Sequence, residues 1–130
     1  MKILLIYPYF LDARLDEEDI RFAPMGLYHV AAVLKEHGHE VDVLNWHDIQ
    51  RTPEIIEATL RARKPDVVGF SILHANRWGG IEIARHTKRL NPATTVVFGG
   101  VGATHLWEHL LTHFPEIDYM VLGEGEHTFL

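Results

Sequence analysis

The sequence predicts an α/β fold in which five parallel strands form a doubly wound sheet. Five short apolar runs lack the alternation of a half-exposed sheet, which is typical of strands buried on both faces. Stretches with helical periodicity and short connections separate them, which favours parallel strands joined by right-handed crossovers. For five strands the common solution is the flavodoxin-like order 2-1-3-4-5. The runs are Ile3–Tyr7, Val41–Leu44, Val67–Phe70, Thr95–Phe98 and Tyr119–Leu122.

Four helices are predicted between the strands, and their ends carry the usual signals. The first, Gly26–His37, has apolar residues at i, i+3, i+4 and i+7, and Gly38 behind it accepts a left-handed C-cap. The second, Pro53–Arg63, places proline at the first helical position behind a capping threonine, Thr52. The third and fourth are Asn76–Leu90 and Gly102–His113. The fourth carries an apolar stripe made of Ala103, Leu106, Trp107, Leu110, Leu111 and Phe114.

Composition excludes several classes of function. The 130 residues are 47% hydrophobic and 23% charged, which indicates one globular domain, residues 1–130. The net charge of −6 disfavours nucleic-acid binding. The absence of cysteine removes disulfides, thiolate metal sites and iron–sulfur ligands from this chain, and it fits a cytoplasmic location. No stretch approaches the roughly 18 apolar residues of a membrane span, so we expect no membrane contact.

Two segments depart from regular alternation. The connection Pro8–Pro24 is long, and its acidic part, residues 11–23, fits either a functional loop or a solvated flap. After the fifth strand only Gly123–Leu130 remains, which is too short for the last helix of a doubly wound fold. We therefore expect a truncated last helix. We also expect that the chain is a fragment of a longer protein, or that a partner such as a second copy covers the bare sheet face.

The candidate site lies at the carboxyl ends of the strands, because open parallel sheets bind ligands where neighbouring connections diverge. Strand three ends in Ser71-x-Leu73 and strand four ends in Gly99-Gly100. The glycines would leave bare backbone beside a ligand, although a tight strand-to-helix turn explains them equally well. The serine hydroxyl could hydrogen-bond a ring nitrogen, worth about 1 kcal/mol, and the leucine could pack on a flat heterocycle. This pattern suits a long, narrow, partly aromatic ligand.

Other ligand motifs of this fold class are absent. The turn after the first strand is Pro8-Tyr9, without the glycines of a dinucleotide fingerprint or the hydroxyl-rich loop of a flavin phosphate site. Strand three does not end in the aspartate of a phosphorelay receiver, and there is no Walker loop.

Several segments carry a resemblance to a known family over nearly the whole chain. They are Lys2–Pro8, Ala23–Leu27, Gly38–Val41, Lys64–Ser71, Val97–Gly100 and Asp118–Glu126. In these segments the chain resembles the cobalamin-binding domain at the N-terminus of many radical S-adenosylmethionine (radical SAM) enzymes. The last segment is the most specific.

The resemblance implies a module that holds cobalamin, with the nucleotide tail in the strand-end crevice. Ser71, Leu73, Gly99 and Gly100 match tail-binding positions of that family. The full candidate set is Pro8, Tyr9, Met25, Ser71, Leu73, His74, Gly99, Gly100, Val101, Gly123, Glu124 and Gly125. The resemblance also implies a partner barrel domain in the parent chain, holding S-adenosylmethionine and a four-iron four-sulfur cluster. Methyl transfer or radical rearrangement would occur there, so we expect no catalytic residue in this chain.

Two departures from related cobalamin domains matter. No histidine lies between Pro8 and Pro24, so we expect no histidine below cobalt; Tyr9 and Phe10 either face the corrin or pack the loop. Val101-Gly102 replaces a common Pro-His pair. Some relatives keep the fold without cobalamin, which leaves a second hypothesis, an empty module that positions substrate or docks domains. A crevice plugged by Tyr9, Met25 or His74 would favour the second hypothesis, and an open one the first.

Histidines and tryptophans suggest further roles. His105, His109 and His113 share one side of the fourth helix, and two at i, i+4 could hold zinc. A structural zinc site needs four ligands, so we predict that this row faces solvent and binds no metal. His74 is either an exposed loop residue or a contact to the amide side chains of the corrin. Trp78 and Trp107 are expected in the core or at an interface.

Overall fold

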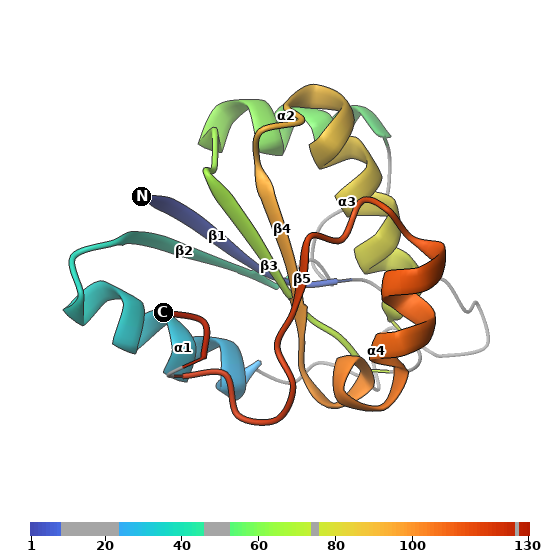
Figure 1. Ribbon diagram of the computed structural model, residues 1–130. Coiled ribbons are helices and arrows are strands. Elements are labelled where there is room, and N and C mark those ends of the chain that lie inside the picture. The colour runs from blue at the N-terminus through green and yellow to red at the C-terminus, as the bar shows by residue number, and fades with distance from the viewer. Residues whose placement is uncertain (9–23, 46–52, 74–75, 127) are drawn as a thin grey trace, which may run out of the picture.

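The computed structural model describes residues 1–8, 24–45, 53–73, 76–126 and 128–130. Five strands form one parallel sheet in the order β2-β1-β3-β4-β5, which confirms the predicted fold class and strand order (Figure 1). The strands are β1 (Lys2–Tyr7), β2 (Glu40–Asn45), β3 (Val67–Ser71), β4 (Thr95–Gly99) and β5 (Tyr119–Met120). The helices are α1 (Met25–Glu36), α2 (Pro53–Arg63), α3 (Arg77–Leu90) and α4 (Val101–His113).

Most element ends lie within one residue of the predicted ones, and Gly38 has the left-handed φ of 85° expected of a C-cap. The exception is β5, which is two residues long instead of four. Its last sheet bond runs from the Val121 N–H to the Phe98 carbonyl, and the chain then turns at Gly123, whose φ is 74°. The predicted capping residue Thr52 lies outside the described residues.

Successive side chains of each strand point to opposite faces, so the sheet has a hydrophobic core on each side. The two cores differ in size. On one side α2, α3 and α4 pack against Leu4, Ile6, Val68, Phe70 and Phe98 and form the larger core. On the other side α1 packs against inward residues of β1 and β2. Among the described residues after β5 there is no helix, and the C-terminal segment, residues 121–126 and 128–130, runs back toward α1 (Figure 1).

The C-terminal segment partly covers the α1 side, where the sequence analysis expected a bare face. Phe129 packs on the core of this side, and its N–H closes a single turn with the Gly125 carbonyl at 2.9 Å. A hollow remains beside it, lined in part by Ile3, Val97 and Tyr119.

The predicted stripe on α4 is wrong for Trp107 and Leu111, which are exposed. The buried contacts of α4 come instead from Ala103 and Leu110, with Leu106 partly buried. Successive helical residues are about 100° apart, so positions 107 and 111 lie past the edge of this narrower stripe. Trp78 is also exposed on one side and packs edge-on against Phe114, with ring centroids 5.8 Å apart.

Candidate functional site

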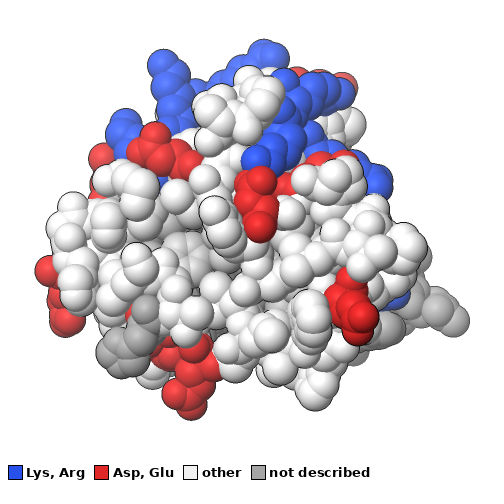
Figure 2. Space-filling model, in the orientation of Figure 1, with Lys and Arg blue, Asp and Glu red and all other residues white. Residues whose placement is uncertain are grey.

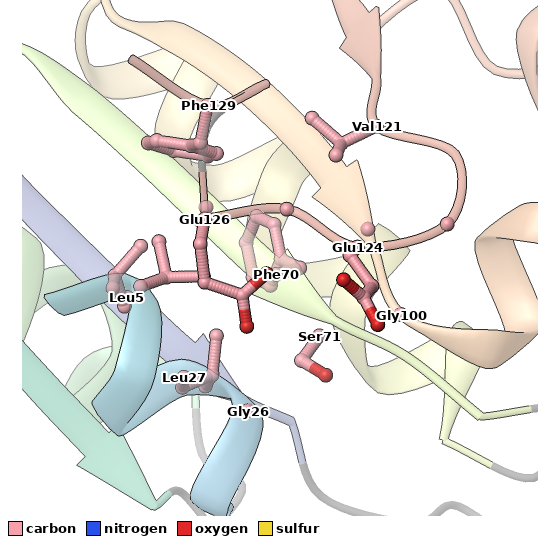
Figure 3. A pocket seen from close by; sticks show the side chains of 15 residues that line it. Leu5, Gly26, Leu27, Phe70, Ser71, Gly100, Val121, Glu124, Glu126 and Phe129 are labelled. Carbon is pink, nitrogen blue, oxygen red and sulfur yellow. The ribbon is translucent and has the colours of Figure 1, made fainter. Parts of the chain in front are cut away.

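An open pocket of about 660 Å³, its mouth included, lies at the carboxyl ends of β1, β3 and β4. Part of this volume is open to solvent at the mouth of the pocket. The pocket lies between the first turns of α1 and the C-terminal segment (Figure 3). Its lining residues are Leu5, Gly26, Leu27, Val30, Gly69, Phe70, Ser71, Gly99, Gly100, Val121, Gly123, Glu124, Gly125, Glu126 and Phe129.

Glycines shape the pocket in two ways. A Cβ at Gly69, in the middle of β3, would lie 2.8 Å from Leu5 Cδ2 and 3.0 Å from Phe129 Cζ. The missing side chain therefore lets both walls approach the sheet. At Gly26, in the first turn of α1, an added Cβ would meet nothing within 4 Å, so this glycine faces open space.

Gly100 is explained by the turn from β4 into α4, without any ligand. Its φ is 92°, and an added Cβ would lie 2.9 Å from the Ile72 carbonyl oxygen and 3.0 Å from Ser71 Oγ. Gly102 is tighter still, because its Cβ would lie 2.7 Å from the Leu73 carbonyl carbon. At Gly99 the nearest atom to an added Cβ is Val121 Cβ at 3.6 Å, an ordinary contact distance. The tight-turn interpretation of the double glycine thus holds for Gly100.

The structure brings six of the predicted site residues together around the pocket: Ser71, Gly99, Gly100, Gly123, Glu124 and Gly125. Four others lie outside its lining. Met25 and Val101 are 60% and 64% exposed, so neither side chain plugs the pocket. Leu73, expected to face the ligand, packs instead on the α1-side core, and Pro8 is buried at the end of β1. Tyr9 and His74 lie outside the described residues.

Nine lining residues were absent from the predicted set: Leu5, Gly26, Leu27, Val30, Gly69, Phe70, Val121, Glu126 and Phe129. Gly69 interrupts an otherwise branched and aromatic strand, a pattern that marks close approach of another group, so it could have been found. Glu126 and Phe129 lie in a segment without periodicity, and only the folded chain reveals their positions.

A buried asparagine joins the segments that follow β1 and β3. Asn76 is fully buried; its Oδ1 accepts the Leu73 N–H at 2.6 Å, and its Nδ2 donates to the Pro8 carbonyl at 3.3 Å. The chain just after β3 is thereby tied to the end of β1. Because β1 and β3 are neighbours in the sheet, this side chain links the segments that follow their carboxyl ends.

We expect Asn76→Ala to destabilise the fold by about 2 kcal/mol, because it leaves the Leu73 N–H and the Pro8 carbonyl buried without a partner. The loss is measured as the change in free energy of unfolding in urea. Asn91→Ala is the matched control, since it removes one exposed hydrogen bond, from the Ala93 N–H at 3.1 Å. Equal stabilities for the two variants would show that the hydrogen bonds of Asn76 with Leu73 and Pro8 do not stabilise the fold.

The lining carries negative charge and no compensating cation. Glu124 and Glu126 contribute two carboxylates, and none of the described lining residues is Lys, Arg or His. In Figure 2 the lysines and arginines gather at the top of the view, over α2 and the end of α3. At the end of β1 burial raises the pKa of Tyr7 above its ordinary value.

The histidine row of α4 lies away from the pocket. His105, His109 and His113 are exposed, as predicted, and the rings of His109 and His113 are 4.7 Å apart. Within the described ranges, no three metal-ligating side chains come together. In the same part of the chain, no helix is both long and apolar enough to cross a membrane.

The fold and the pocket define a ligand-binding domain of the doubly wound type, with its site at the topological switch point of the sheet. The sequence profile of the B12 binding domain family matches residues 19–130, most of the chain. The chain belongs to the B12-binding domain family, which confirms the resemblance found in the sequence.

Curated relatives agree with this assignment. An uncharacterized methyltransferase of Pyrococcus horikoshii is 30% identical over 99% of this chain and 28% of its own length. A cytidylyl-2-hydroxyethylphosphonate methyltransferase of Streptomyces wedmorensis is 28% identical, over 99% of this chain and 27% of its own length. An anaerobic magnesium-protoporphyrin IX monomethyl ester cyclase of Synechocystis is 28% identical, over 98% of this chain and 26% of its own length. The chain thus spans about a quarter of the length of these relatives.

Proposed function

We propose that this domain binds cobalamin, with the nucleotide tail of the cofactor in the pocket at the carboxyl ends of β1, β3 and β4. The single observation that carries the proposal is an open, largely apolar pocket at the switch point of a B12-binding domain. Met25, whose side chain could have filled the crevice, does not line the pocket and is exposed. This supports a ligand-binding role over an empty docking module.

The lining fits the chemistry of the tail. Leu5, Leu27, Val30 and Phe129 supply apolar walls for a flat aromatic base. The Ser71 hydroxyl extends into the pocket and can donate a hydrogen bond to a ring nitrogen (Figure 3). Gly99 and Gly100 also line the pocket, and the narrow part of the tail would pass beside their backbone. The pocket is too small for a whole corrin, which would lie at its mouth.

We further propose that no histidine of this chain ligates cobalt from below. The segment between Pro8 and Pro24, where related domains carry that histidine, has none, and none lines the described pocket. With its own base drawn into the pocket, the cofactor would be bound in the base-off form.

The parent protein is proposed to be a radical SAM enzyme of which this chain is one domain. Its barrel domain would hold S-adenosylmethionine and a four-iron four-sulfur cluster, and cobalamin would supply a cobalt centre for methyl or radical chemistry. The relatives named as methyltransferases and cyclases support this class without choosing the reaction. A cytoplasmic location, and contact of the α1-side hollow with a second copy, stay predictions.

Titration of the purified chain with cob(II)alamin tests the proposal. We expect saturable binding, an absorption spectrum of the base-off form, and an electron paramagnetic resonance signal without nitrogen splitting from an axial ligand. Absence of binding at high micromolar cofactor, with a folded sample, would contradict cobalamin binding. Nitrogen splitting in the bound state would contradict the base-off assignment, because the axial nitrogen would come either from a histidine of the chain or from the cofactor's own base.

A further inference from the structure

Two carboxylates enter the candidate pocket from the C-terminal segment. In Figure 3 the Glu126 side chain points into the pocket between Leu27 and Phe70, and the Glu124 carboxylate lies nearer Ser71 and Gly100. Glu126 is partly buried, whereas Glu124 is exposed. Neither carboxylate has a hydrogen-bond or ion-pair partner within the part of the chain that the structure describes.

An unpaired carboxylate in an apolar pocket restricts which chemical groups of a ligand can lie beside it. It accepts hydrogen bonds and cannot donate them, so a complementary ligand must present O–H or N–H groups at that point. Since the described lining holds no cation, a phosphate there would meet like charge with nothing to offset it. The ligand segment that reaches Glu126 is therefore neutral and rich in donors.

We propose that Glu126 is a specificity-determining residue that accepts hydrogen bonds from the ribose hydroxyls of the cobalamin tail. This inference rests on the proposed function. The ribose hydroxyls are the donors of the nucleotide itself, while the amide donors of the corrin would stay outside the pocket. The phosphodiester of the tail would lie away from Glu126. The domain would thereby prefer corrinoids with a nucleotide tail to tailless ones, and would reject phosphate-bearing flavins.

The test compares cobalamin with cobinamide, which has the corrin but lacks the ribose and base. We expect Glu126→Ala to weaken cobalamin binding by about tenfold, as for loss of a charge-assisted hydrogen bond near solvent. Glu126→Gln, which keeps an acceptor without the charge, should weaken it less, and cobinamide affinity should not change. Glu108→Ala removes an exposed carboxylate of α4 and serves as the matched control. Circular dichroism checks that each variant folds.

The possible results of these titrations separate the role of Glu126 from the proposed binding of cobalamin. If the unsubstituted chain binds cobalamin and Glu126→Ala binds it equally well, the inference is overturned while the proposed function stands. If Glu126→Ala weakens cobalamin and cobinamide alike, the ribose assignment is overturned. If the folded chain binds neither corrinoid, the proposed function fails and the inference fails with it. Tight binding of flavin mononucleotide by the unsubstituted chain would contradict the charge argument.

Discussion

Replacement of Ser71 by tryptophan is expected to weaken cobalamin binding by at least about 100-fold, because the indole ring would occupy the space proposed for the nucleotide tail. Ser71 ends β3, and its side chain faces the open pocket instead of the core (Figure 3). The ring can therefore be accommodated without displacing buried side chains, and the fold should survive. Equilibrium titration measures the affinity, and far-ultraviolet circular dichroism monitors the fold.

Two control variants define what this result means. Thr112→Trp places the same side chain on the exposed side of α4, away from the pocket, and should leave the affinity unchanged. Ser71→Ala removes only the hydroxyl, and we expect a loss of about fivefold, the value of one neutral hydrogen bond. Unchanged affinity in a folded Ser71→Trp protein would discredit the proposed path of the tail.

The second large effect concerns stability. We expect Gly102→Ala to lower the free energy of unfolding by about 3 kcal/mol, since the new methyl group would lie 2.7 Å from the Leu73 carbonyl carbon and 2.9 Å from the Ile72 carbonyl oxygen. Both neighbours are backbone atoms, and the Gly102 N–H also donates to Ile72 at 2.9 Å, so neither segment can move away cheaply. This clash outweighs the roughly 1 kcal/mol by which alanine favours a helix.

Gly26→Ala is the matched comparison for this substitution. It adds the same methyl group to a glycine in the first turn of a helix, with nothing within 4 Å of the new atom. We expect it to be neutral or slightly stabilising in the same urea unfolding experiment. A Gly102→Ala protein as stable as Gly26→Ala would mean that the chain after β3 does not lie against the start of α4 as described.

The local hydrophobic pattern of the sequence predicted the strands and their order, but it predicted only part of the candidate site. Short apolar runs such as Val67–Phe70 indicated buried parallel strands, and the parallel order places Ser71, Gly99 and Gly100 at one edge of the sheet. Alternation along the chain after β3 could not place Leu73, because Asn76 and Gly102 hold that chain in a turn. The Leu73 side chain therefore packs on the core beneath α1 and not in the pocket.

The sequence by itself determined the fold class, the strand order and the edge of the sheet at which a ligand could bind. These properties depend on the local hydrophobic pattern and on the right-handedness of crossover connections, and both can be inferred from short segments of the sequence. Only the tertiary structure decided which side chains wall the pocket. The C-terminal segment has no pattern of its own, and its path depends on Phe129 packing over Gly69, a contact between residues far apart in the chain. That contact places Glu126 inside the pocket, where no local rule would have put it.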